Sequence, residues 1–148
     1  MMTSGRKDIQ IRRTTADKLL VGLQQRILEA NRNRSFLYRI KRAVVFGSYV
    51  SEPDRDRIGD LDIGIEWEPK VPLDSDRMHR KQKEYPGSDW LSAMNWPKEE
   101  VVRFLRNRSA YISIHDFAID SEAILSKEII ELDVVPSKKR RDSIHEAS

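Results

Sequence analysis

The spacing of apolar residues differs between segments of this chain: some segments have the spacing typical of helices and others the alternation typical of strands. A first helix is expected to begin at a cap at Thr14 or Thr15 and to end in the polar stretch 31–34. Its apolar positions recur at helical spacing: Leu19, Leu20, Leu23, Ile27 and Leu28. Another helix is expected to open at Pro97, because proline is favoured at the first helical position.

Four segments have the pattern of strands: 41–46, 60–67, 111–117 and 128–135. The second alternates strictly, with Leu61, Ile63 and Ile65 facing one way. Asp60 and Asp62 face the other way. The polar loop 49–59 is expected to hold a helical turn at its start, and segments 74–83 and 120–127 are expected to be short helices. Helices and strands together predict an α/β (α+β) fold.

The length of 148 residues suits one domain. We expect a flexible lead over 1–13, a single folded domain over 14–135 and a flexible tail over 136–148. The net charge of +3 is concentrated in the lead and the tail, so the domain between them is slightly acidic. A basic tail can bind nucleic acid, or it can simply be a solvated end of the chain.

Several classes of protein do not fit the composition. Cysteine is absent, which excludes disulfides, zinc–thiolate sites and a cysteine nucleophile. No apolar run approaches the length of a membrane span, so no membrane partner is expected. Residues 1–13 lack the apolar core of a signal peptide, and we expect a cytoplasmic location.

The candidate chemistry is concentrated around two short motifs. Asp60 and Asp62 lie two residues apart on a predicted strand, so their carboxylates share a face about 7 Å apart at the backbone. Like charges placed together are unfavourable unless a cation lies between them, and Mg²⁺ is commonly held by one or two carboxylates plus substrate phosphates. Upstream, Gly47 and Ser48 end a buried strand in a turn that can cradle phosphate oxygens. Taken alone, each motif also fits an ordinary turn or a wet strand face.

The order of these motifs resembles the nucleotidyltransferase superfamily that includes DNA polymerase beta, especially its minimal single-domain bacterial members. The resemblance implies a mixed sheet flanked by helices, a nucleoside triphosphate bound with two Mg²⁺ ions, and transfer of a nucleoside monophosphate to an acceptor hydroxyl. By the same resemblance, Gly47 and Ser48 would hold the triphosphate, and Asp60 and Asp62 would bind the metals. It covers residues 44–66 well and the rest of the domain loosely.

The superfamily often adds a third carboxylate on a later strand. Asp116 is the first candidate for this catalytic and metal-binding position, because it ends an apolar strand. Asp133 is the second candidate. His115 can be a general base or a histidine packed on the strand, and two-metal transfer does not need a base.

The leading function is therefore Mg²⁺-dependent transfer of a nucleoside monophosphate to a hydroxyl of a protein or RNA acceptor. The chain is too short for a large acceptor-binding domain, so the acceptor is expected to be small, to be held across a homodimer, or to be a macromolecule. The resemblance also implies a toxin–antitoxin system with a partner protein. The alternatives are a non-catalytic module of the same fold that binds a nucleotide or a partner, and a nucleic-acid-binding protein that uses its basic ends.

Overall fold

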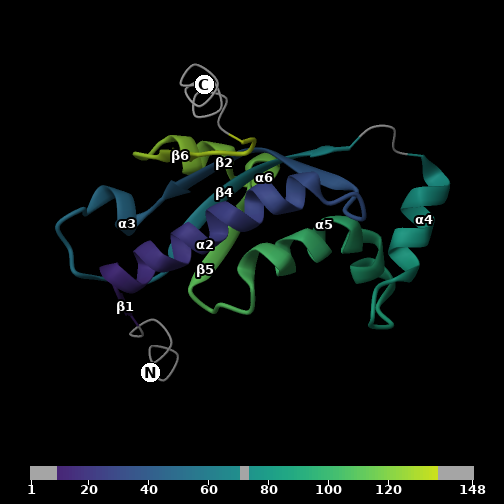
Figure 1. The fold of residues 1–148 in the computed structure, drawn as a ribbon, viewed down its shortest axis with the longest axis horizontal. Coiled ribbons are helices and arrows are strands. Elements are labelled where there is room, and N and C mark those ends of the chain that lie inside the picture. Colours follow the sequence, from purple (N-terminus) through teal and green to yellow (C-terminus); the bar gives the residue numbers. More distant parts are fainter. Residues whose placement is uncertain (1–9, 71–73, 137–148) are drawn as a thin grey trace, which may run out of the picture.

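The centre of the structure is a four-stranded mixed sheet with helices on both faces (Figure 1). The structure is a computed structural model that describes residues 10–70 and 74–136. The strands are β2 (Tyr38–Phe46), β4 (Leu61–Pro69), β5 (Ile112–Asp116) and β6 (Ile130–Leu132), in the order β5-β4-β2-β6. β2 is antiparallel to β4 and β6, and β5 is parallel to β4. The expected α/β fold with a mixed, helix-flanked sheet is confirmed.

A second, two-stranded sheet ties the start of the described chain to the polar loop. β1 (Ile11–Arg12) pairs antiparallel with β3 (Arg57–Ile58). The loop opens with the one-turn helix α3 (Ser48–Ser51), which confirms the expected helical turn. Most of the predicted flexible ends, 1–9 and 137–148, lies outside the described residues.

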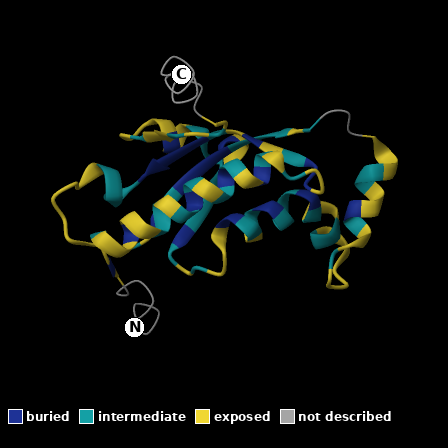
Figure 2. Ribbon diagram, in the orientation of Figure 1, coloured by how far each residue is buried: buried dark blue, intermediate teal, exposed yellow. Residues whose placement is uncertain are grey.

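One face of the central sheet is covered by α2 (Arg13–Arg32) and α5 (Trp90–Arg106). Apolar side chains from both helices meet those of the strands in one buried cluster, which includes Leu23, Ile27, Ile63, Val101 and Leu105. Figure 2 shows the central strands buried beneath these helices. None of the helices in the described ranges is long and apolar enough to cross a membrane.

The expected cap of the first helix at Thr14 or Thr15 is wrong. α2 begins at Arg13, and Arg12 at the cap position makes no side-chain cap hydrogen bond. The reason is tertiary, because pairing of β1 with β3 leads the chain directly into the helix. The Arg13 amide, one of the first-turn N–H groups without an acceptor inside the helix, donates to the carbonyl of Asp56 at 2.6 Å.

The expected helix start at Pro97 is also wrong. α5 begins seven residues earlier, at Trp90. The Asp89 side chain caps it, accepting from the Ser92 amide at 2.9 Å and from the Ser92 hydroxyl at 2.6 Å. Pro97 lies inside the helix, where it removes one helical hydrogen bond, and its ring is buried in the interior.

The helix α4 (Ser75–Lys83) packs against α5 at the end of the molecule away from α3 (Figure 1). Its Lys81 is buried and lies 2.8 Å from a carboxylate oxygen of Glu100 and 3.1 Å from one of Glu84. A buried ammonium is stable only with such partners. The prediction of a short helix in this charged segment is confirmed.

Among the described residues, the helix on the opposite face of the sheet is α6 (Phe117–Leu125). A small cluster of Val44, Phe46, Phe117 and Ile124 holds this helix in place. A Cβ at Gly64 would lie 3.1 Å from Ile124, so the glycine permits the close approach of α6 to β4. This thinner cover leaves room on the same face for polar side chains.

Candidate functional site

The turn after β2 has a conformation and surroundings that require glycine. Gly47 has φ 84°, a left-handed value that other residues rarely adopt. A Cβ at this position would lie only 2.4 Å from Oδ2 of Asp62. The Gly47 carbonyl accepts from the amides of Val50 and Ser51 at 3.0 and 2.9 Å, and half-buried Ser48 begins α3. The two motifs that the sequence singled out therefore come into direct contact.

Asp62 is the half-buried carboxylate of the site. It pairs with Phe46 across β2 and β4, which places it beside the turn. Burial raises the pKa of Asp62, and the nearby charge of Asp60 raises it further, whereas the hydrogen bond with His115 lowers it. Asp60 is exposed and directly precedes β4. The expected pair of carboxylates thus lies at one strand start, with Asp62 against the turn and Asp60 in solvent.

The register between β4 and β5 decides which later residue reaches Asp62. Asp62 is opposite Ser113, and Gly64 is opposite His115. Because side chains two residues apart share a face, His115 points to the same side of the sheet as Asp62. Its position was visible in the sequence, since the apolar alternation of β5 leaves Ser113 and His115 on the other face.

His115 makes the central contacts of the site. Its Nε2 lies 3.2 Å from Oδ1 of Asp62 and 3.2 Å from Oγ of Ser113. Its Nδ1 lies 3.9 Å from Oδ2 of Asp120, which comes from α6. The ring of Phe46 packs edge-on against the imidazole, with centroids 5.1 Å apart. These contacts fix the imidazole between two carboxylates.

The structure does not bring Asp116, the first candidate for a third metal ligand, beside Asp62. Asp116 is paired with Ile65, three residues and about 10 Å further along β4 than Asp62. Its Oδ1 accepts from the Ala118 amide at 2.8 Å and so caps α6, and its Oδ2 lies 4.0 Å from Nζ of Lys98. Strand alternation turns it away from the face that His115 shares with Asp62.

The second candidate, Asp133, does not reach the site either. It follows β6, which lies on the far side of β2 from β4. Its amide donates to the side chain of Gln24 at 2.9 Å, and its carbonyl accepts from the same side chain at 2.6 Å. Asp133 therefore joins α2 to the edge of the sheet.

Arg13 holds the loop behind the turn, and the sequence prediction missed it. Its guanidinium donates to the carbonyls of Tyr49, Glu52 and Arg55 at 3.0, 2.7 and 2.8 Å. It also lies 4.8 Å from the centre of the Tyr49 ring. The sequence contains no local signal for this role, because the loop is about forty residues away and its carbonyls carry no sequence pattern.

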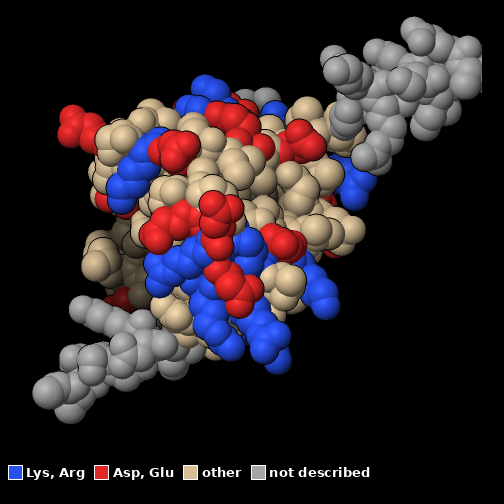
Figure 3. Space-filling view, turned by 90° about the vertical axis from the view of Figure 1, so that its left-hand side faces the viewer, with Lys and Arg blue, Asp and Glu red and all other residues tan. Residues whose placement is uncertain are grey.

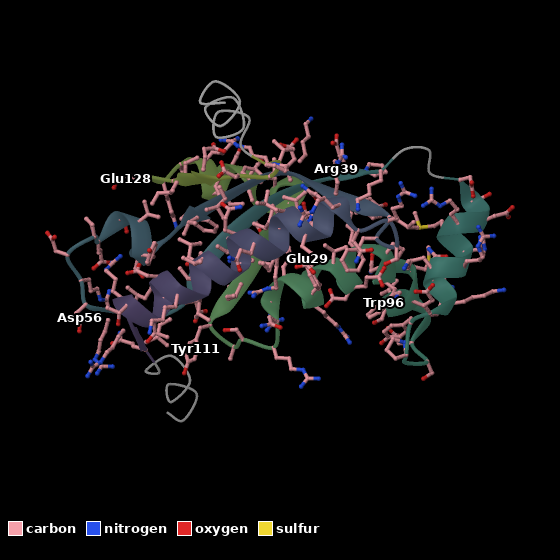
Figure 4. All side chains as sticks on the ribbon, in the orientation of Figure 1. Glu29, Arg39, Asp56, Trp96, Tyr111 and Glu128 are labelled. Atoms are coloured by element: carbon pink, nitrogen blue, oxygen red, sulfur yellow. The ribbon has the colours of Figure 1, made fainter. Side chains whose placement is uncertain are left out.

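Charged side chains surround this end of the molecule. Arg12 and Arg57 are neighbours across β1 and β3, and both are exposed. Figure 3 shows Lys and Arg gathered on the end that carries α3 in Figure 1, with Asp and Glu among them. In Figure 4, Asp56 marks the polar loop and Glu128 the chain beyond α6, both towards this end. Such a mixed surface can attract an anionic ligand without binding it by itself.

The chemistry of the donor set suits one divalent cation. Asp60 and Asp62 supply carboxylate oxygens, and His115 supplies an imidazole nitrogen. Within residues 10–70 and 74–136, no group of three or more His, Asp or Glu side chains is arranged to hold a metal alone. A cation here would therefore take its other ligands from phosphates and water, as Mg²⁺ commonly does.

Comparisons of this chain with protein-family models, with curated proteins and with solved structures each find no match. The resemblance to nucleotidyltransferases consequently depends on the motifs in 44–66 and on the way the fold joins them.

Proposed function

We propose that this protein binds a nucleoside triphosphate with a divalent cation at Gly47, Ser48, Asp60 and Asp62, and transfers the nucleoside monophosphate to a hydroxyl of a protein or RNA. The observation that carries the proposal is the contact between the Gly47 turn and the Asp62 carboxylate. A phosphate held by the turn would lie beside the carboxylate that holds its cation.

Each residue has a distinct part in this proposal. Gly47 lets the phosphates approach the backbone, and the Ser48 hydroxyl supplies one hydrogen bond. Asp62 and Asp60 hold the cation, which neutralises charge on the phosphates and the leaving group. Arg13 keeps the loop after the turn in place through its three carbonyl contacts.

A second function has its own support, namely a module of the same fold that binds a nucleotide or a partner without transfer. Two-metal transfer needs a further ligand for the ion that activates the hydroxyl. Neither Asp116 nor Asp133 reaches Asp62, and His115 stands in that place. This geometry supports binding of a nucleotide or a partner more strongly than it supports nucleotidyl transfer. The binding of two Mg²⁺ ions stays a prediction.

One pair of measurements distinguishes these functions. Calorimetry with non-hydrolysable triphosphates and Mg²⁺ or Mn²⁺ tests binding, and labelled triphosphates in cell extract test transfer to protein or RNA. Asp62→Asn should lose binding by at least about tenfold, whereas the matched control Asp116→Asn should retain it, because Asp116 contacts Ala118 and Lys98 and not Asp62. A labelled product means transfer, and binding without product means the module. Absence of binding with either cation would refute both.

The remaining predictions follow from the sequence and from the resemblance. A partner protein in a toxin–antitoxin system, a homodimer and a cytoplasmic location stay predictions. The labelling experiment also identifies the acceptor, because protein and RNA products separate on a gel.

A further inference from the structure

The site places an imidazole where the two-metal arrangement would need a carboxylate. β5 lies next to β4, with Ser113 opposite Asp62 and His115 two residues further along on the same face. The Asp62 oxygen and the His115 Nε2 are 3.2 Å apart. Two neighbouring ligands of one octahedral ion with bonds of about 2.0–2.1 Å lie about 2.8–3.0 Å apart. The observed separation is therefore close to that of two ligands of one cation.

A carboxylate lies on the other side of the imidazole, at ion-pair distance and beyond hydrogen-bond distance. Metal-binding histidines usually present one ring nitrogen to the metal and donate the other N–H to a carboxylate or a carbonyl. Here Asp120 of α6 lies 3.9 Å from Nδ1, on the far side of the ring from Asp62. The Phe46 ring packs against the imidazole and limits its rotation. The ring is thus held with Nε2 directed at Asp62.

The donor atoms of the site, oxygen and nitrogen, determine which divalent cations it prefers. Mg²⁺ takes oxygen ligands, whereas imidazole nitrogen suits first-row transition metals. A site with carboxylate oxygens, one imidazole and substrate phosphates therefore favours an ion that accepts both oxygen and nitrogen. Mn²⁺ is such an ion, since it forms octahedral complexes with oxygen ligands and belongs to the first transition row.

We propose that Asp62 and His115 together hold one divalent transition-metal ion, for which Mn²⁺ is the probe, in place of a pair of Mg²⁺ ions. The inference rests on the cation site of the proposed function and adds His115 to it as a ligand. The competing explanation is that His115 only forms a hydrogen bond with Asp62 and takes no part in metal binding.

The test measures metal binding directly. Loss of the free Mn²⁺ signal in electron paramagnetic resonance gives the Mn²⁺ affinity of the full chain, and competition gives the Mg²⁺ affinity. We expect Mn²⁺ to bind at least about tenfold more tightly than Mg²⁺. His115→Ala should weaken Mn²⁺ binding at least about tenfold. His115→Asp should reduce the preference for Mn²⁺, because it replaces nitrogen by oxygen. The matched control is His79→Ala, since His79 lies on α4 and contacts the Ser75 carbonyl.

The outcomes separate this inference from the proposed function. Equal affinity for Mn²⁺ and Mg²⁺ in the unchanged protein, or Mn²⁺ binding unaffected by His115→Ala, would overturn the inference. The comparison of Mn²⁺ with Mg²⁺ uses the unchanged protein, so it does not depend on whether a variant folds. Binding of a non-hydrolysable triphosphate with Mg²⁺ would at the same time preserve the proposed function. Mn²⁺ binding that depends on His115, without any triphosphate binding, would support the metal site and refute the nucleotide site.

Discussion

The two faces of the central sheet differ in what covers them. The face under α2 and α5 contains most of the fully buried apolar side chains. The face under α6 has a small apolar cluster, and beside it lie half-buried Asp62, His115 and Ser113. One face therefore supplies most of the hydrophobic stabilisation, and the other tolerates polar groups in fixed positions.

This division explains how a short chain can hold a buried carboxylate. Burial of Asp62 costs free energy, as its raised pKa indicates. The apolar face offsets that cost because its side chains are removed from water almost completely. The contrast predicts large stability effects on one face and mainly functional effects on the other.

The largest effect should come from the apolar face. Ile63→Ala removes a fully buried side chain and should lower the free energy of unfolding by about 2–5 kcal/mol. Urea unfolding followed by circular dichroism measures this loss. Ile63→Val is the control and should cost about 0.5–1.5 kcal/mol. A cost below about 1 kcal/mol for the alanine variant would contradict the division between the faces.

The next effect should come from the turn. Gly47→Ala introduces a side chain at φ 84° and against the Asp62 carboxylate, and each of these problems costs about 1–3 kcal/mol. Binding of a triphosphate should be lost as well. Gly59→Ala is the matched control, because a Cβ there meets nothing within 4 Å. Thermal unfolding and calorimetry of both variants check the prediction, and equal behaviour of the two would contradict it.

A smaller effect is expected at the loop behind the turn. Arg13→Gln removes hydrogen bonds to three carbonyls and should cost about 1–2 kcal/mol, because water can replace part of the contacts. Hydrogen exchange should quicken in the loop 49–56 but not in α5. Arg12→Gln, at an exposed neighbouring position, should leave both unchanged. Unaltered exchange in Arg13→Gln would mean that the loop does not depend on this residue.

The smallest effect concerns pH. The folded state raises the pKa of Asp62 above its ordinary value of 3.8, so the ionised carboxylate destabilises the fold. This penalty is present at neutral pH and disappears as the pH falls through the raised pKa. Asp62→Asn should therefore unfold at a higher temperature than the unchanged protein at pH 7, and the difference should shrink towards pH 3.8. A difference that stays constant over this range would contradict the assigned cause.

Local patterns in the sequence were sufficient for much of this description. The alternation around Ile63 placed β4, and the apolar runs placed β2 and the core of α2, because these signals depend only on neighbouring residues. The sequence singled out the Gly47 turn and Asp62, whereas their contact comes from the pairing of β2 with β4. The start of α5 was missed because Pro97 is a common first helical residue, whereas here the Asp89 cap and the buried ring decided otherwise.

The sequence by itself thus determined the strands, the alternation of β4 and the candidate turn with its carboxylate. Only the tertiary structure decided that β5 pairs with β4 and that His115 comes within 3.2 Å of Asp62, because this pairing joins residues that are distant in the chain. It also brought Arg13 to three carbonyls of the loop, which no local pattern marks. The physical reason is that the free energy of the whole domain decides which distant segments pair. The pairing therefore cannot be predicted from any single segment.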